Sequence, residues 1–129
     1  MPHLAIQYSA NLETQTDLQA LCDTLSDVMI ETGLFPKGGI RVRAMACSSY
    51  AIADNHAQNG FADMVLRMGA GRSLQDRQRA GEAILAAAKT HFQGLLDQPH
   101  FALSLEIIEI DPNLSWKVNS IHPRLKLAN

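Results

Sequence analysis

The sequence predicts an α/β fold of the α+β layer type, in which a four-stranded mixed sheet carries two helices on one face. A strand pattern, a capped helix and a second strand pattern follow one another twice within 129 residues. The two candidate helix caps, Thr16 and Ser73, lie 57 positions apart. Because a β-α-β crossover is right-handed and joins parallel strands, each unit contributes one parallel pair to the sheet.

Composition limits the classes of function. Hydrophobic residues make up 47% of the chain and charged residues 19%, which fits one folded domain. The net charge of -2 provides no cationic field for nucleic acid. The longest apolar run, residues 83–88, is far shorter than the roughly 20 residues that span a bilayer. With no secretory signal pattern either, we expect a cytoplasmic protein that binds neither nucleic acid nor membranes.

The cysteines and histidines give no signature of a disulfide or a metal site. Cys22 falls in a helix pattern and Cys47 in a strand pattern, so both are expected to be small buried hydrophobes. The five histidines are scattered without the spacing of metal ligands.

The first β-α-β unit is expected over about residues 2–47. Alternating apolar residues predict a strand at positions 4–8. Thr16 opens a capping-box pattern, and an apolar stripe at three- and four-residue steps predicts a helix from about 17 to 32. Gly33 then offers a left-handed helix stop. Period-two alternation predicts the second strand at 40–47.

The second unit is expected over about residues 61–110. A strand pattern covers 61–68, and Ser73 is a good N-cap for a helix that runs to about residue 97 before Pro99. A rich strand pattern follows at 101–110. Residues 1–129 then form a single domain with a C-terminal tail at 111–129. The uncovered second face of such a sheet predicts a homo-oligomer that packs sheets together.

Pro2 is the first candidate for chemistry. Removal of Met1 would leave a secondary amine at the start of a strand. An α-amino group titrates near about 7.7 to 8.0, and burial or nearby cations lower that pKa toward the range useful for general acid-base catalysis. The alternative is that proline at position 2 has no catalytic role.

Arginines are the next candidates. Arg72 follows Gly69-Ala70-Gly71 at the N-terminal end of a predicted helix, the unfavourable end of the helix dipole for a cation. A ligand carboxylate there would meet both free N–H groups and the guanidinium, although a solvated surface arginine remains an equal alternative. Arg41 and Arg43 share one strand face, spaced for a ligand with two carboxylates or for carboxylates of a neighbouring subunit. One of this pair is expected to be structural.

Three weaker candidates are His3, Trp116 and Lys117. His3 beside Pro2 could carry a proton, but a hydrogen-bonded structural histidine is the commoner case. Trp116 and Lys117 could line a pocket or pack an oligomer interface, where aromatic residues are enriched.

Several of these segments together resemble the tautomerase superfamily, and within it the 5-carboxymethyl-2-hydroxymuconate isomerase family. The resemblance covers nearly the whole chain. Its motifs are Met1-Pro2-His3, Gly33-Leu34-Phe35-Pro36, Gly39-Ile40-Arg41-Val42-Arg43, Gly69-Ala70-Gly71-Arg72-Ser73-Leu74, Arg77-Gln78, Ala80-Gly81, Lys89-Thr90-His91-Phe92 and Leu103-Ser104-Leu105-Glu106-Ile107.

The resemblance implies a homotrimer of tandem β-α-β subunits, with active sites near subunit boundaries and without a metal or organic cofactor. It implies that Met1 is removed and that Pro2 corresponds to the catalytic amino-terminal proline. Arg41 and Arg72 match the active-site arginines by their flanking motifs, and Arg43 is less securely assigned. The implied reaction moves a proton from the 2-hydroxyl to carbon 5 of a dienol tricarboxylate, in bacterial homoprotocatechuate degradation.

Two alternatives stay open at this stage. The chain could catalyse another reaction of the superfamily, such as a 2-hydroxymuconate tautomerisation, a dehalogenation or a hydration. It could instead be a non-catalytic trimeric protein on the same fold whose arginines bind a partner's carboxylates. Fold is the safer inference, because one fold supports many chemistries.

Overall fold

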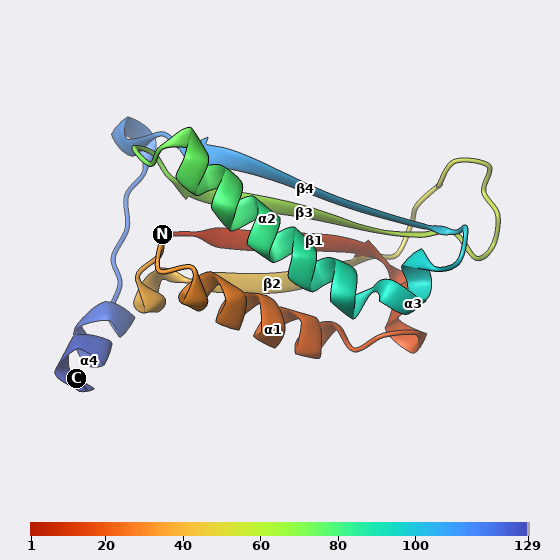
Figure 1. Ribbon diagram of the computed structural model, residues 1–129, viewed down its shortest axis with the longest axis horizontal. Helices are drawn as coiled ribbons and strands as arrows, with labels where there is room; N and C mark the ends of the chain where they lie inside the picture. Colours follow the sequence, from red (N-terminus) through yellow and green to blue (C-terminus); the bar gives the residue numbers. More distant parts are fainter. Residues whose placement is uncertain (129) are drawn as a thin grey trace.

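Two β-α-β units build the sheet and its helices. The computed structural model describes residues 1–128. The first unit is β1 (His3–Ser9), α1 (Leu18–Glu31) and β2 (Arg41–Cys47), and the second is β3 (Gly60–Gly69), α2 (Leu74–His91) and β4 (Phe101–Ile110). In Figure 1, α1 and α2 lie side by side over the same face of the sheet. The predicted strands and the helix-on-one-face arrangement are confirmed.

The sheet is mixed, with strand order β2-β1-β3-β4. β1 runs parallel to β2 and β3 runs parallel to β4, whereas the central pair β1 and β3 is antiparallel. His3 therefore pairs with Arg41 on one side and with Arg67 on the other. This topology brings the starts of β1 and β2 to the same end of the sheet as the ends of β3 and β4. We call it the site end, and the opposite one the far end.

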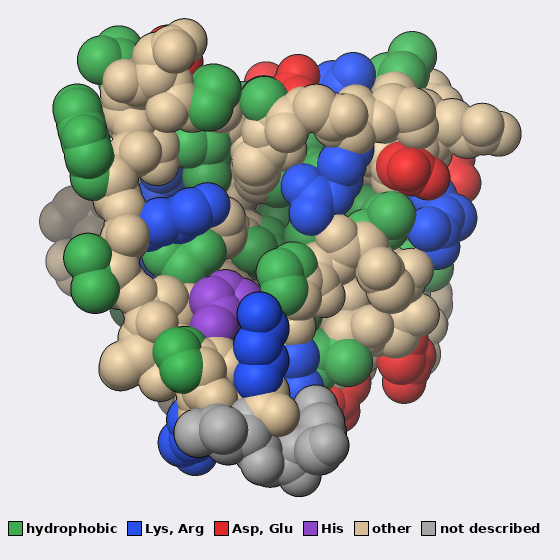
Figure 2. All heavy atoms as spheres, turned by 90° about the vertical axis from the view of Figure 1, so that its left-hand side faces the viewer, with side chains coloured by type: hydrophobic (Ala, Val, Ile, Leu, Met, Phe, Trp, Pro, Cys, Tyr) green, Lys and Arg blue, Asp and Glu red, His purple; other side chains and the backbone are tan. Residues whose placement is uncertain are grey.

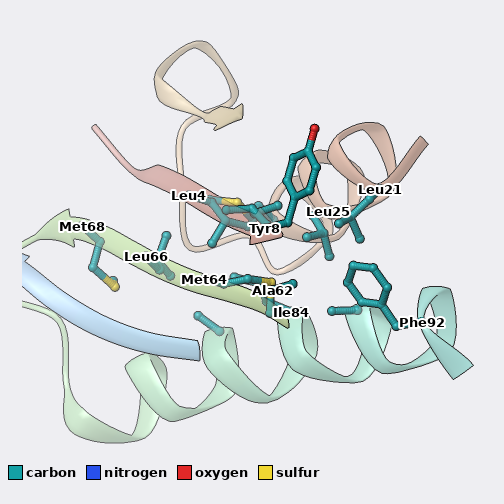
Figure 3. Close-up of a cluster of buried hydrophobic side chains, with 14 of the residues drawn as sticks. Leu4, Tyr8, Leu21, Leu25, Ala62, Met64, Leu66, Met68, Ile84 and Phe92 are labelled. Atoms are coloured by element: carbon teal, nitrogen blue, oxygen red, sulfur yellow. The ribbon is translucent and has the colours of Figure 1, made fainter. Parts of the chain in front are cut away.

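The core lies between the sheet and the two helices (Figure 3). Alternate residues of the central strands point toward the helices, and the apolar stripes of α1 and α2 meet them. Burying each such Leu, Ile or Met side chain contributes about 1.5–3 kcal/mol. Fully buried members include Leu4, Ile6, Leu21, Leu25, Met29, Met64, Leu66, Met68 and Ile84.

The cap of the first helix differs from the prediction by one residue. Asp17 is the N-cap of α1, and its carboxylate accepts a hydrogen bond from the Ala20 N–H at 3.0 Å. Thr16 is not the cap, because its hydroxyl lies 2.7 Å from Nε2 of His91 on the neighbouring helix. At the other end Gly33 has a φ of 71°, as the predicted left-handed stop requires.

The second helix ends earlier than predicted. Ser73 caps α2 by accepting from the Asp76 N–H, as expected. The helix does not continue to residue 97, because the backbone leaves helical geometry at Phe92 and a separate short helix, α3 (Gln93–Leu96), follows. Phe92 is 1% exposed and its ring packs on Phe101 at a centroid distance of 4.8 Å. Burial of this ring accompanies the break.

The C-terminal tail contains structure that the sequence patterns did not predict. After β4 the chain forms a 3-10 turn, η3 (Pro112–Leu114), crosses the site end in an extended segment and finishes in α4 (Ile121–Ala128) (Figure 1). α4 contacts η2 (Lys37–Gly39), the 3-10 turn that precedes β2. Between β1 and α1 lies a further turn, η1 (Ala10–Thr14). The tail therefore reaches the region beside the chain's N-terminus.

The sheet face opposite the helices carries apolar and charged side chains together. Met45 and Ile108 are each 41% exposed on it, beside Arg43, Asp63 and Arg67. Both cysteines are free thiols, but each is half-buried and not fully buried as the sequence patterns predicted. Within residues 1–128, no helix combines the length and the hydropathy needed to cross a bilayer.

Candidate active site

Pro2 lies buried at the site end, directly before β1. A proline at this position interrupts no ladder hydrogen bond of the strand. Its carbonyl accepts a hydrogen bond from the Arg41 N–H at 3.1 Å, which fixes the entry into β1 against the start of β2. With Met1 attached, the Pro2 nitrogen is a tertiary amide and has no basic lone pair. Removal of Met1 would convert it into the chain's terminal amine.

The side chain of Met1 fills the space beside Pro2 at the site end. Its Sδ lies 3.2 Å from Nη1 of Arg41 and 3.2 Å from Nδ2 of Asn119. The side chain also approaches Gly39, where a Cβ would lie 3.5 Å from both the Met1 Cγ and the Pro2 Cδ. The volume that Met1 fills is thus bounded by η2, by the start of β2 and by the tail.

Arg41 opens β2 and pairs with His3. Its Nη1 donates to the Gly39 carbonyl at 3.1 Å as well as contacting Met1. The guanidinium is half-buried and its described partners are neutral. A half-buried cation that keeps neutral partners retains the ability to bind an anion.

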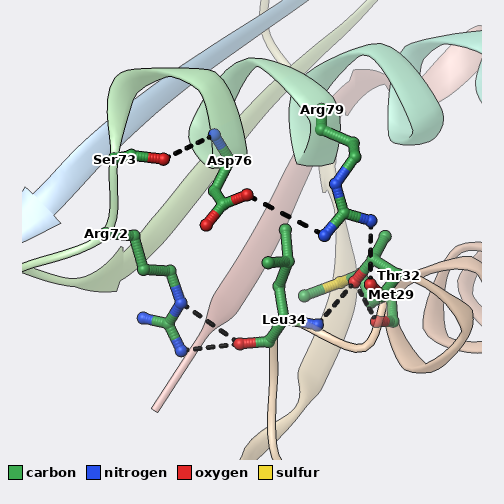
Figure 4. Close-up of polar contacts among 7 residues, drawn as sticks. All are labelled: Met29, Thr32, Leu34, Arg72, Ser73, Asp76 and Arg79. Carbon is green, nitrogen blue, oxygen red and sulfur yellow. Dashed lines mark hydrogen bonds and ion pairs between the residues drawn. The ribbon is translucent and has the colours of Figure 1, made fainter.

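Arg72 lies in the connection from β3 to α2, where Gly71 adopts a φ of 106°. Its Nε and Nη2 donate to the Leu34 carbonyl at 3.1 and 2.7 Å, and Nη1 donates to the Gly69 carbonyl at 3.3 Å (Figure 4). Its Cζ is 5.2 Å from the centroid of the Phe35 ring. These contacts fix the orientation of the guanidinium without neutralising its charge.

Neighbouring arginines behave differently. Arg77 forms an ion pair with Glu109 at 3.3 Å, and Arg79 lies 3.9 Å from Asp76. No ion pair of Arg41 or Arg72 is found within the described residues. Arg41 and Arg72 therefore have no acidic side chain to neutralise them within the described residues.

The positive charges around the terminal amine affect its pKa. Burial, followed by the charges of Lys117, Arg72 and Arg41, lowers the pKa of the Met1 amine below its ordinary value. Figure 2 views the site end directly: Lys, Arg and His side chains lie around the middle of the face, whereas Asp and Glu lie toward its rim.

The tail is fixed against the turn that precedes β2. Asn119 donates from Nδ2 to the Gly38 carbonyl at 2.9 Å. A Cβ at Gly38 would lie 2.6 Å from Nδ1 of His122, so only glycine lets the tail approach this closely. The extended segment that bears Lys117 is thereby held near the Met1 amine.

Arg43 and His3 lie on the sheet face away from the helices. Nη1 of Arg43 is 3.1 Å from Nδ1 of His3. Burial, then the charges of Arg67, Arg43 and Arg41, lowers the pKa of His3 and favours a neutral ring. Arg41 and Arg43 share one face of β2, as predicted. The side chain of Arg43 contacts that of His3, whereas the side chain of Arg41 contacts Met1. This arrangement favours the structural interpretation of Arg43.

Trp116 is 84% exposed, so its role as a lining residue stays a prediction for a ligand or a second subunit. Asn119 was not a candidate from the sequence. It lies 118 positions from Met1, and an isolated asparagine in a polar tail carries no motif. The feature that a sequence pattern could have shown is a helix cap, because asparagine is a preferred residue there and Oδ1 accepts from the N–H groups of Ile121 and His122.

The described residues contain no group of three or more side chains arranged to hold a metal ion. What the site end offers is a set of fixed hydrogen-bond donors and cations around one amine position. Such a set can bind carboxylates and can stabilise negative charge as it develops on an oxygen.

Comparison with known proteins agrees with this geometry. The family model for 5-carboxymethyl-2-hydroxymuconate isomerase matches residues 2–125. The chain is 38% identical to the 5-carboxymethyl-2-hydroxymuconate Delta-isomerase of Escherichia coli over 126 residues, which are 98% of this chain and 100% of that protein.

Solved structures extend the comparison to the fold. A 5-carboxymethyl-2-hydroxymuconate isomerase from Deinococcus radiodurans R1 superposes with a TM-score of 0.90 at 36% identity, covering 96% of this chain and 93% of that one. A fused 4-OT symmetric trimer, at 19% identity, shares the fold with a TM-score of 0.66 over 90% and 93% of the two chains. The chain belongs to the 5-carboxymethyl-2-hydroxymuconate isomerase family.

Proposed function

We propose that this protein is an isomerase that ketonises 5-carboxymethyl-2-hydroxymuconate, with the amine of Pro2 as the proton carrier after Met1 is removed. The observation that carries the proposal is the position of Pro2. Pro2 is buried next to the Met1 amine, and burial together with the charges of Lys117, Arg72 and Arg41 lowers the pKa of that amine. The family membership supplies the substrate class.

The reaction needs one group that accepts a proton at oxygen and returns it at carbon. The O–H bond of the 2-hydroxyl breaks, the Pro2 amine takes the proton, and a C–H bond forms at carbon 5 while the two double bonds shift to give the conjugated ketone. An amine with a pKa near the working pH serves both steps, because it is partly neutral and easily protonated. No electrons change hands, so the proposed step needs no redox cofactor.

Arg41 and Arg72 take the substrate's terminal carboxylates in this proposal. Their guanidiniums also stabilise the negative charge that develops on the 2-oxygen as its proton leaves. Because neutral carbonyls already fix Arg72, the substrate meets a guanidinium in a prepared orientation. Arg43, His3 and Trp116 have no step assigned in this reaction.

The same proposal includes a homotrimer. The sheet face without helices carries Met45 and Ile108 at 41% exposure, an apolar surface that packing against other copies would cover. A fused 4-OT protein of the same fold is a symmetric trimer. Light scattering after size exclusion should then give about three times the 14.1 kDa of one chain; a value for one or two copies would refute the trimer.

The test of the activity is the loss of dienol absorbance when Met1-processed protein meets 5-carboxymethyl-2-hydroxymuconate. Parallel reactions use 2-hydroxymuconate and omit the enzyme. Fast, protein-dependent loss with the carboxymethyl compound, and slow loss with 2-hydroxymuconate, supports the proposal and makes the third carboxylate part of recognition. Loss at the uncatalysed rate with both compounds overturns it, and a preference for 2-hydroxymuconate moves the assignment to a different tautomerase reaction.

A further inference from the structure

Two hydrogen-bond donors from distant parts of the chain converge on one atom at the site end. Nη1 of Arg41 and Nδ2 of Asn119 each lie 3.2 Å from Sδ of Met1. A thioether sulfur is a weak acceptor and carries no charge. Two strong hydrogen-bond donors, one of them cationic, therefore face a side-chain atom that is only a weak acceptor.

The amide of Asn119 is oriented by its other contacts. Its Oδ1 accepts from the backbone N–H groups of Ile121 and His122 at 2.7 and 3.2 Å, so the oxygen faces α4 and the nitrogen faces the site. One N–H of Nδ2 donates to the Gly38 carbonyl at 2.9 Å. The second N–H is the one that points at the Met1 sulfur.

Loss of Met1 leaves both donors aimed at the same vacated volume. That volume borders the Pro2 nitrogen, because Met1 is attached to it. An oxygen atom of a carboxylate placed there would accept one hydrogen bond from a guanidinium and one from a neutral amide. A charge-assisted hydrogen bond of this kind is roughly twice as strong as a neutral one.

We propose that Asn119 is a substrate-binding residue, which together with Arg41 holds one carboxylate oxygen of the substrate beside Pro2. The inference rests on the proposed isomerase function and assigns a role in it to the C-terminal tail. It also explains why the tail packs so closely on Gly38 and η2. The alternative is that Asn119 serves only to cap α4 and to anchor the tail.

Two substitutions separate these roles. Asn119→Asp keeps a capping oxygen and the side-chain size but replaces the donor with a negative charge, whereas Asn119→Ser keeps a capping hydroxyl without charge. Asn113→Asp is the matched control, since it makes the same charge change in the same tail, where Asn113 contacts Asp111. Steady-state kcat and KM on 5-carboxymethyl-2-hydroxymuconate are measured for the Met1-processed forms at low and high salt.

The expected result is that Asn119→Asp raises KM about 10- to 100-fold and Asn119→Ser by less, with Asn113→Asp within about twofold of the unmodified protein. Added salt should reduce the Asn119→Asp effect, because it screens the repulsion between two carboxylates. Both Asn119 variants lose the anchoring hydrogen bond to the Gly38 carbonyl, so a purely anchoring role predicts similar KM values for the two and no effect of salt. An Asn119→Asp KM within twofold of the unmodified protein, or an Asn119→Ser effect larger than that of Asn119→Asp, would overturn the inference.

A binding measurement keeps this test separate from the proposed function. Calorimetry with propane-1,2,3-tricarboxylate, which cannot isomerise, reports carboxylate binding by the same four proteins. If the unmodified protein is inactive on the dienol but binds this anion with the same dependence on Asn119, the isomerase proposal fails and the inference stands. If the unmodified protein turns over the dienol and the Asn119 variants keep its KM, the inference alone fails. No binding and no turnover would refute both.

Discussion

The two ends of the sheet handle polar groups in opposite ways. At the site end, Arg41 and Arg72 donate to backbone carbonyls and keep their charge. At the far end, a network of amide, carbonyl and carboxylate groups centres on Asn59, which is 8% exposed. Its Nδ2 donates to the Ile52 carbonyl and to Asp54, and its carbonyl accepts from Asn11.

The proposed function accounts for the difference, because it makes the site end a binding surface and the far end a structural one. The far-end contacts join the loop between β2 and β3 to Asn11 of η1, and Nδ2 of Asn59 has two acceptors within that loop. Arg41, Arg72 and Lys117 at the site end have no anionic partner among the described residues, and they surround one amine. A protein that needed only stability would pair such cations, as it pairs Arg77 with Glu109.

The largest expected effect comes from blocking the amine at the site end. An N-terminal extension that retains Met1 keeps the Pro2 nitrogen as an amide, so isomerase activity should fall by about 10²- to 10⁴-fold, the range for losing a general acid-base. The dienol absorbance assay measures it. Proteolytic removal of the extension to expose Pro2 should restore the activity, and an extended protein that is fully active would exclude Pro2 as the base.

Removing one cation should have the next largest effect. Arg72→Ala should lower kcat/KM by about 100-fold, since a charged hydrogen bond to a carboxylate contributes about 1.5–3 kcal/mol. Circular dichroism checks that the fold is retained.

Arg79→Ala is the matched control for this prediction. Its guanidinium also donates to a carbonyl of the same turn, that of Thr32 at 3.0 Å, but it is near Asp76 (Figure 4). Its loss should change kcat/KM by less than about twofold. Equal effects of the two substitutions would mean that the turn, and not the free charge, sets the activity.

The far end should respond in stability and not in activity. Asn59→Ala removes one hydrogen bond to the carboxylate of Asp54 and one to the Ile52 carbonyl, each contributing about 0.5–1.5 kcal/mol, which should lower the free energy of unfolding by about 1–3 kcal/mol. Urea denaturation measures the change. Because the network is far from Pro2 along the strands, kcat/KM should stay within about twofold, and a large loss of activity in a folded variant would remove the distinction between the ends.

The smallest effect concerns pH and the contact between the two helices. Burial lowers the pKa of His91, against a weaker opposing effect of Asp17, so the folded state favours the neutral ring. The stabilisation is complete above the unfolded pKa of about 6.5 and is lost as the pH falls through the folded value. Urea midpoints should therefore fall less steeply below pH 6.5 in His91→Gln than in the unmodified protein; parallel slopes would contradict this assignment.

Local patterns in the sequence account for most of the fold. Local strand patterns, most of them with period-two alternation, located β1 to β4, and the Ser73 cap and the Gly33 stop depend on groups within one turn of the helix. The break at Phe92 was not predictable from the apolar stripe, because the ring's burial against Phe101 depends on tertiary packing. Assigning the first cap to Thr16 was wrong, since its hydroxyl binds His91 on the other helix.

The candidate site was predictable only in part. Pro2, Arg41 and Arg72 stand out in the sequence because each combines a local anomaly with a motif of the family. Their convergence depends on the mixed topology, which brings the starts of β1 and β2 beside the end of β3. Asn119 contacts Met1 because the tail packs closely on Gly38, where a larger side chain would collide with His122. No local sequence pattern predicts that contact.

The central claim is that the site end holds the Pro2 amine at a low pKa. An NMR titration of Met1-processed protein labelled with 15N-proline measures that pKa directly. The account predicts a value below the ordinary α-amino range of about 7.7–8.0, and a rise toward that range when Lys117 or Arg72 is replaced by alanine. An amine that titrates at or above this range in the unmodified protein would contradict the account.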